Sequence, residues 1–153
     1  MYEVYTDGAT SGNGKVDAPG GWAYVVLKGG EIILADSGSE IGTTNQRMEL
    51  TAAYKACQVI DALAPLADVT LYSDSAYFIN CYKQGWWKAW EANGWKNSKK
   101  QPVANQDLWE KLIPFFKKAP GYKFIKVTGH AGNKYNEIVD KMAVAAKEEI
   151  MNG

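Results

Sequence analysis

The sequence predicts an α/β fold built around a mixed β-sheet, and two observations carry this prediction. The first 40 residues contain three runs of strand-forming residues, at about 4–8, 20–27 and 31–40, and a Gly-Gly turn joins the last two. Such runs with tight turns form an antiparallel meander. A helical pattern and a fourth strand at 69–74 follow. Because strand–helix–strand units join parallel strands, this fourth strand should run parallel to the first.

The remaining elements follow from hydrophobic periodicity and capping residues. A helix is predicted over about 45–63, capped by Thr44 or Asn45, and another begins at Ser75. Asn105 should cap a further helix, which Pro114 would kink or shorten. A fifth strand is expected at 121–127 and a last helix at about 135–150. The core-facing residues are expected to be Met48, Ala52, Ala56, Val59 and Leu63 in the first helix, Leu108, Trp109, Leu112, Ile113 and Phe116 after Asn105, and Val139, Met142, Ala143, Ala146 and Ile150 in the last helix.

Length and composition fit one globular domain spanning residues 1–153. Hydrophobic residues make up 46% and charged residues 22% of the chain, which are ordinary values for such a domain. No apolar run approaches the ~20 residues of a transmembrane helix, and the first residues do not resemble a signal peptide, so we expect a cytoplasmic protein. Cys57 and Cys81 lie in no metal-binding pattern and should be reduced core thiols, which argues against a zinc site.

Four acids occupy comparable places in this predicted fold. Asp7 ends the first strand, Asp74 ends the fourth, and Glu49 and Asp140 lie near the starts of two helices. Ligands of open α/β sheets bind at the carboxyl ends of strands, so these carboxylates can converge on one edge. Oxygen-only ligands favour Mg²⁺ or Mn²⁺, because unpaired acids packed together would repel one another. Two such ions about 4 Å apart would suit cleavage of a phosphodiester.

Plainer interpretations of the same residues stay open at this point. Asp7-Gly8 can be an ordinary turn, and a chain with 17 acids places some at strand ends and helix starts by chance. His130, the single histidine, can be structural, although its glycine-rich loop lies ten residues before Asp140.

A segment rich in tryptophan and lysine at about 83–101 also has two interpretations. Residues 83–100 carry four of the six tryptophans and five lysines against one acid, in a chain whose net charge is zero. The aromatic residues can form a small satellite core with solvated lysines around it. Alternatively, the segment can bind nucleic acid by stacking and phosphate contacts, which is the interpretation that we favour.

The chain resembles the bacterial type 1 ribonuclease H family along nearly its whole length. Each matching motif is short, but their order and spacing together are specific. The motifs are Tyr5-Thr6-Asp7-Gly8, Gly20-Gly21-Trp22, Thr44-Asn45-Gln46-Arg47-Met48-Glu49-Leu50, Ser73-Asp74-Ser75-Ala76-Tyr77, Gly94-Trp95-Lys96, Asn105-Gln106-Asp107-Leu108-Trp109, and Gly129-His130-Ala131-Gly132 with Asn136-Glu137 and Asp140.

The resemblance implies a five-stranded mixed sheet in the order 3-2-1-4-5, with the first three strands antiparallel and helices on both faces. It implies an endonuclease that cuts the RNA strand of an RNA–DNA hybrid and leaves 5′-phosphate and 3′-hydroxyl ends. The cofactor would be two Mg²⁺ ions, with Mn²⁺ as a substitute. The family's catalytic and metal-binding acids fall on Asp7, Glu49, Asp74 and Asp140, and its mobile-loop histidine falls on His130.

The resemblance also suggests substrate contacts and reveals departures from the family pattern. Asn13, Asn45 and Gln46 match minor-groove contacts, Thr44 and Asn105 match a pocket for a phosphate of the DNA strand, and Trp86 and Trp90 match aromatic residues of a basic protrusion. Gln46 replaces a usual asparagine, Ala76 a frequent glutamine, and Glu91-Ala92-Asn93 a common basic run, and the loop from Gly14 to Pro19 is longer than usual. We therefore expect weaker hybrid affinity.

Two other functions fit parts of the sequence. A non-catalytic nucleic-acid-binding module would bind without cleaving, but it gives no reason to keep four acids. A junction resolvase or integrase-like nuclease would share the acid-bearing sheet, but not the Trp/Lys segment or the His130 loop. We expect a monomer with no membrane contact and no obligate protein partner.

Overall fold

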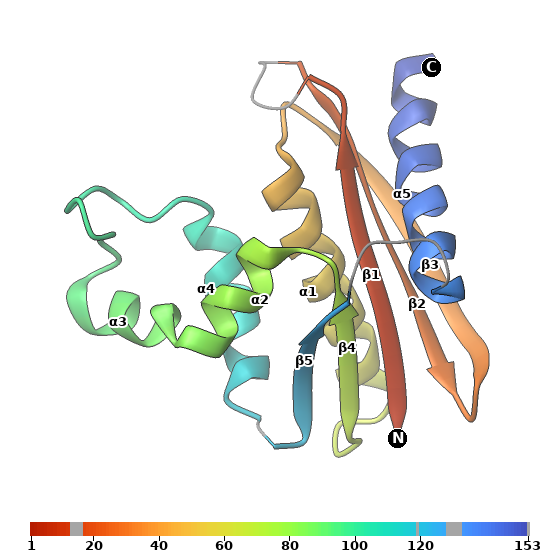
Figure 1. The fold of residues 1–153 in the computed structure, drawn as a ribbon, viewed down its shortest axis with the longest axis horizontal. Helices are drawn as coiled ribbons and strands as arrows, with labels where there is room; N and C mark the ends of the chain where they lie inside the picture. The colour runs from red at the N-terminus through yellow and green to blue at the C-terminus, as the bar shows by residue number, and fades with distance from the viewer. Residues whose placement is uncertain (13–16, 119, 128–132, 153) are drawn as a thin grey trace.

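The computed structural model describes residues 1–12, 17–118, 120–127 and 133–152. This part of the chain forms five strands and five helices (Figure 1). In chain order they are β1 (Tyr2–Thr10), β2 (Pro19–Lys28), β3 (Glu31–Ile41), α1 (Asn45–Leu63), β4 (Val69–Ser73), α2 (Ala76–Gln84), α3 (Trp86–Asn93), α4 (Gln106–Phe116), β5 (Tyr122–Lys126) and α5 (Lys134–Asn152).

The strands form one mixed sheet in the order β3-β2-β1-β4-β5, which confirms the predicted topology. β2 pairs antiparallel with both β1 and β3, whereas β4 pairs parallel with β1 and β5. The β2–β3 hairpin turns at Gly29 and Gly30, whose φ angles of 61° and 83° are those that a tight hairpin turn requires. The central strand therefore joins the meander to the parallel half of the sheet.

Strand β1 is longer than predicted, and this changes the setting of Asp7. Its ladder with β4 stops at the pair Thr6–Ser73, but its ladder with β2 continues to Thr10. Asp7 is thus the first residue beyond the parallel ladder and not the last residue of the strand. The long β2 strand supplies the extra pairing, so Asp7 is held in a continuing strand while the β4 side is left open.

Apolar residues pack on both faces of the sheet. The larger cluster joins Val4, Tyr24 and Val26 to buried residues of α1, α2 and α4, and the smaller joins Val25 and Leu27 to Val139 of α5. Figure 1 shows α1 and α5 running alongside the sheet. The predicted stripe of α1 is wrong at its last residue: Leu63 is 55% exposed, whereas Ile60 is fully buried and Val59 is half-buried against the core.

Helix α4 extends through Pro114 and ends two residues later, at Phe116. The missing N–H of Pro114 affects only the last turn, so the helix is shortened rather than broken. Asn105 occupies the N-cap position as predicted, but its side chain makes no capping hydrogen bond. Its φ of 63° lies in the left-handed region, which asparagine tolerates better than most residues.

Helix α3 and the loop after it project away from the sheet and form a protrusion, residues 83–101 (Figure 1). Gly85, with φ of 69°, ends α2 and directly precedes α3. The N–H groups of Trp95 and Val103 bond back to the carbonyl oxygens of Trp90 and Trp95. The protrusion thus follows directly on α2, and its Trp90 packs against Trp109 of α4 with ring centroids 5.7 Å apart. Within the described ranges, no helix is both long and apolar enough to cross a membrane.

Candidate active site

Three carboxylates converge where β4 stops beside β1. One carboxyl oxygen each from Asp7, Glu49 and Asp74 lies within 4.8 Å of the others. Asp7 comes from β1, and Asp74 lies between β4 and Ser75, the residue that caps α2. Glu49 lies in the second turn of α1, which begins at Asn45. The sheet edge thus gathers acids from three separate elements.

Gly8 allows α1 to approach β1 closely enough for this arrangement. A Cβ atom at Gly8 would lie 2.6 Å from the backbone N of Glu49 and 2.6 Å from the carbonyl carbon of Met48. Side-chain carbon atoms do not come that close to a backbone, so any larger residue would push α1 outwards. The glycine after Asp7 therefore serves the packing of Glu49 against the strand.

The acids line an open cleft of about 390 Å³. Asp140, in the second turn of α5, lines the same cleft and is exposed, whereas Asp7 and Glu49 are buried. The complete lining is Asp7, Gly8, Asn45, Gln46, Glu49, Asp74, Ser75, Ala76, Tyr77 and Asp140. The four acids predicted from the sequence therefore share one cavity, although their chemical roles stay predictions.

Burial and mutual repulsion make these carboxylates difficult to ionise together. Burial raises the pKa of Asp7 to about 7; the charge of Asp74 adds to the rise, and a hydrogen bond from the Gly8 N–H opposes it. Burial, followed by the charge of Asp7, raises the pKa of Glu49 well above its usual range. Burial, followed by the charge of Asp140, raises the pKa of Asp74. The cluster therefore favours anything that neutralises it.

A divalent cation fits this donor set. Asp7 Oδ2 and Glu49 Oε2 are buried and lack hydrogen-bond partners among the described residues. Buried carboxylate oxygens normally have partners, so two such orphans in one cleft indicate a missing positive ligand. Oxygen donors suit hard cations such as Mg²⁺. Cys57 and Cys81 are buried in the core and do not line the acid cleft, and burial raises the pKa of both thiols.

The predicted substrate-contacting residues lie at different distances from the acids. Asn45 and Gln46 line the cleft, and Asn45 Oδ1 accepts a 2.8 Å hydrogen bond from Thr10 Oγ1. Thr44 caps α1 by accepting from the N–H of Arg47. Asn105 does not line the cleft, but it contacts the cleft through Tyr77, to which its side chain donates. Asn13 and His130 lie outside the described residues.

The tryptophans of the protrusion divide between packing and exposure. Trp87 is buried in the core, and Trp90 and Trp95 are half-buried against it, which agrees with the satellite-core interpretation. Trp86, however, is 41% exposed. Trp86 and Trp90 line a cavity of about 570 Å³ together with Ala89, Asn93, Lys96, Asn97 and Ser98. The satellite-core interpretation therefore holds for Trp87, Trp90 and Trp95, whereas nucleic-acid binding through Trp86 and Trp90 stays a prediction.

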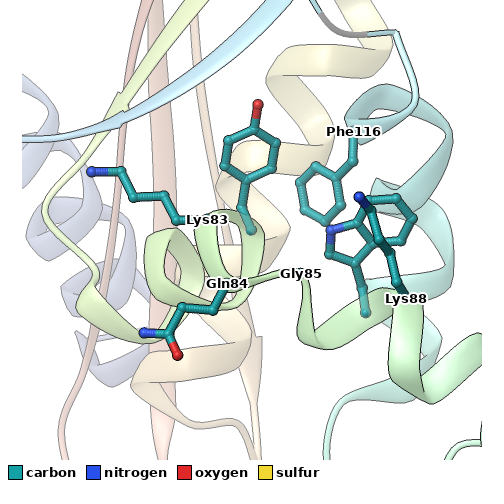
Figure 2. Close-up of a pocket in the computed structure, with 7 residues that line it drawn as sticks. Lys83, Gln84, Gly85, Lys88 and Phe116 are labelled. Atoms are coloured by element: carbon teal, nitrogen blue, oxygen red, sulfur yellow. The ribbon is translucent and has the colours of Figure 1, made fainter.

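A further cavity of about 500 Å³ lies where α2 meets α3 (Figure 2). Its lining shares no residue with the acid cleft. Figure 2 shows Lys83 and Gln84 extending away from Phe116 and Lys88, so polar groups do not converge in it. Binding sites need a few convergent polar groups, and the acid cleft meets that requirement better.

Arg47 and Tyr77 make contacts around the cleft that the sequence analysis did not predict. Arg47 pairs with Asp107 at 2.8 Å, and Tyr77 accepts hydrogen bonds from Asn105 and Trp109. Both residues lie inside recognisable motifs, but their partners are far away in the sequence. No local pattern could have indicated these pairings.

A five-stranded mixed sheet with acids where the parallel pairing of β1 and β4 stops defines the RNase H-like class of folds. The structure of LC9-RNase H1, described as a type 1 RNase H with the type 2 active-site motif, has a TM-score of 0.81 at 28% identity and covers 97% of this chain and 72% of that one. The structure of LC11-RNase H1 in complex with RNA/DNA hybrid, at 21% identity, covers 99% of both chains with a TM-score of 0.69, which shows the shared fold.

Sequence comparison is more specific. The RNase H family model matches residues 1–148. Ribonuclease H of Syntrophomonas wolfei subsp. wolfei is 49% identical over 140 residues, covering 92% of this chain and 91% of the relative. Ribonuclease H of Thermoanaerobacter sp. is 48% identical over 146 residues, covering 94% and 87%. The chain therefore belongs to the RNase H family, as a bacterial type 1 ribonuclease H.

Proposed function

We propose that this protein hydrolyses the RNA strand of RNA–DNA hybrids and leaves 5′-phosphate and 3′-hydroxyl ends. One observation carries the proposal: Asp7, Glu49 and Asp74 place carboxyl oxygens within 4.8 Å of one another in a cleft that Asp140 also lines. The relatives named above are ribonucleases H, and one solved neighbour of the same fold holds an RNA/DNA hybrid.

The acids would hold two divalent cations, Mg²⁺ by preference and Mn²⁺ as a substitute. Asp7 would be shared by both sites, with Asp74 and Asp140 at one and Glu49 at the other. When bound, these ions neutralise the scissile phosphate, lower the pKa of the attacking water and stabilise the leaving oxygen. The chain itself holds the carboxylates in place, because Asp7 is fixed in a continuing strand and Glu49 is fixed by the close contact of α1 with Gly8.

Groups around the cleft would select the hybrid. Asn45 and Gln46 lie beside the acids, where their amides can contact 2′-hydroxyls and base edges in the minor groove. Asn13 would add to these contacts, and His130 would assist proton movement or product release. Thr44 and Asn105 would hold a phosphate of the DNA strand. These roles rest on the family resemblance and on the positions of the residues that the structure describes.

The protrusion would bind the DNA strand through its loop more than through α3. Asn97 Oδ1 accepts hydrogen bonds from the N–H groups of Lys99 at 2.9 Å and Gln101 at 3.0 Å, which orders an otherwise exposed loop. The loop lysines Lys96, Lys99 and Lys100 take part in none of the ion pairs between described residues. An ordered cluster of like charges is favourable when it meets phosphates. Trp86 and Trp90 beside it would stack on sugars or bases.

In α3 itself, the charge pattern is less favourable for nucleic acid. Glu91 forms an ion pair with Lys117 at 3.4 Å, so each of these charges is partly neutralised. This contact supports the expectation of weaker hybrid affinity than in relatives with a basic helix. We further propose that the protein acts as a monomer in the cytoplasm.

The test is a cleavage assay with four labelled substrates in Mg²⁺: RNA–DNA hybrid, double-stranded DNA, double-stranded RNA and single strands. Cleavage confined to the RNA of the hybrid, and lost in EDTA, is the expected result. Binding without cleavage would favour the nucleic-acid-binding module, and cleavage of double-stranded DNA would favour a resolvase or integrase-like enzyme. Asp7→Asn should abolish cleavage, whereas the control Asp36→Asn, at an exposed site on β3, should retain it.

A further inference from the structure

Arg47 lies in the first turn of α1, and its side chain reaches across to the first turn of α4. Its guanidinium makes a two-pronged ion pair with Asp107, from Nη1 to Oδ1 at 3.0 Å and from Nη2 to Oδ2 at 2.8 Å. Nη1 also donates to Asn105 Oδ1 at 3.3 Å. A planar guanidinium that binds a carboxylate through two parallel hydrogen bonds has a fixed orientation. The remaining hydrogen bond, from Arg47 to Asn105, therefore has a fixed direction. The Arg47 side chain is 30% exposed and that of Asp107 is 58% exposed, so the ion pair faces water, whereas the hydrogen bond to Asn105 is partly buried.

This contact determines which way the Asn105 amide points. A guanidinium only donates hydrogen bonds, so Asn105 must turn its oxygen towards Arg47 and its NH₂ group away. One N–H of that group donates to the hydroxyl of Tyr77 at 3.2 Å, and the other has no acceptor among the described residues. Asn105 stands at the N-cap position of α4, but its side chain makes no hydrogen bond to the helix. The side chain bonds to Arg47 and Tyr77 instead, and α4 forgoes the stabilisation of a side-chain cap.

The hydroxyl of Tyr77 is oriented by the same logic. Its oxygen accepts from Asn105 Nδ2 and from the indole N–H of Trp109, at 3.1 Å, and the indole can only donate. With both acceptor positions occupied, the Tyr77 proton must point away from these donors. Trp109 is fully buried and Tyr77 lines the acid cleft, so the hydroxyl stands between the core and the cavity. No described residue accepts its proton.

We propose that Arg47 is a positioning residue for substrate binding: it sets the direction of the Asn105–Tyr77–Trp109 hydrogen bonds so that the free protons of Asn105 and Tyr77 are offered to a phosphate of the DNA strand. This inference rests on the proposed function. Without Arg47, the Asn105 amide can rotate and present its oxygen, which repels a phosphate. Thr44 lies next to this arrangement: its hydroxyl oxygen accepts from the backbone N–H of Arg47, independently of the guanidinium, and its proton is left for another acceptor.

The experiment measures coupling between Arg47 and one phosphate. Hybrid binding is followed by fluorescence anisotropy in the non-cleaving Asp7→Asn background, with a series of hybrids that each carry one neutral methylphosphonate in the DNA strand. One position should weaken binding by about tenfold, the effect of losing a charge-assisted hydrogen bond. In Arg47→Lys, binding of the unmodified hybrid should weaken to a similar degree, and the methylphosphonate at that position should have no further effect. Tyr77→Phe should reduce the response at the same position.

The controls separate positioning from folding and from charge. Arg47→Lys keeps the positive charge, so the dependence of binding on salt should not change. Lys118→Met removes a distant ion pair with Asp61 and should leave the whole methylphosphonate profile unchanged. Should Arg47→Lys unfold, Asp107→Asn loosens the same guanidinium and should lower the response at the same phosphate. Uniform weakening at every position, or unchanged binding, would overturn the proposal. All of these experiments measure binding and not cleavage. The Arg47 proposal can therefore be refuted while the wild-type protein still cleaves hybrids. If the protein does not cleave hybrids, the binding measurements still test the role of Arg47.

Discussion

Replacing Asp7 by asparagine should stabilise the metal-free protein while it abolishes cleavage. Asp7 is 3% exposed and its pKa is raised from an ordinary value of 3.8 to about 7, first by burial and then by the charge of Asp74. The folded protein therefore binds a proton at this site more tightly than the unfolded chain does. The stability that this group contributes is complete below about pH 4 and is lost as the pH rises towards 7.

The size of the effect follows from the same values. A rise in pKa from 3.8 to about 7 corresponds to about 4 kcal/mol of stability lost at neutral pH and above. Asparagine keeps an oxygen for the 2.8 Å hydrogen bond from the Gly8 N–H, but its new NH₂ group lacks a full set of acceptors, which costs about 1 kcal/mol. A net gain of about 3 kcal/mol should raise the Tm of a domain of this size by roughly 6–12 °C.

The assay is thermal unfolding of both proteins in EDTA, from pH 4 to pH 8.5. The two Tm values should be similar near pH 4, diverge as the pH rises and stay apart above pH 7. Mg²⁺ should then raise the Tm of the wild-type protein by binding to its folded form, and should raise that of Asp7→Asn much less. A variant that is less stable than the wild type at pH 8 in EDTA, or a Tm difference that does not depend on pH, would refute this account of the acid cluster.

Three further predictions concern the contacts around the site. Gly8→Ala should lower stability by about 1–3 kcal/mol, seen as a lower Tm, and reduce kcat, because the new methyl group would push Glu49 away from β1. Replacing Lys99 and Lys100 together by alanine should reduce the slope of log K against log salt for hybrid binding by roughly 2, and an unchanged slope would place these lysines outside the interface. Glu91→Lys should tighten hybrid binding at low salt severalfold in the same titration and change the Tm little, because its ion pair with Lys117 is exposed.

The sequence predicted the elements well where short-range patterns decide them. The helix at Asn45–Leu63 is confirmed to the residue, because Thr44 caps it and its apolar spacing is regular. The meander is confirmed because the Gly29-Gly30 turn imposes a hairpin. The extent of β1 was wrong, because strand length depends on the partner strand: β2 continues the pairing to Thr10, and nothing near Asp7 in the sequence shows this.

The site was predictable in its acids and not in its supporting contacts. The acids lie within short motifs, and the order of these motifs along the chain identifies them. The Arg47–Asp107 pair joins residues 60 positions apart, and the Asn105–Tyr77 bond joins residues 28 apart. Their geometry depends on how α4 packs beside α1, which follows from the assembled core rather than from any local pattern. The cap assigned to Asn105 failed for the same reason, because Arg47 takes the side-chain oxygen that would otherwise cap α4.

The placement of Asp7 inside a continuing strand explains how mutually repelling acids stay together. At a free strand end, the carboxylate could turn towards water and relieve the repulsion. Here the backbone on either side of it is fixed by pairing with β2 and by the close approach of α1 at Gly8. The repulsion between Asp7, Glu49 and Asp74 is therefore held in place by the packing of the sheet and α1 and cannot relax by local motion. Relief must come from a proton or a cation, and at neutral pH a divalent ion neutralises more of the cluster than one proton can. The unrelieved repulsion lowers the stability of the metal-free protein, and its relief on binding increases the affinity for divalent ions.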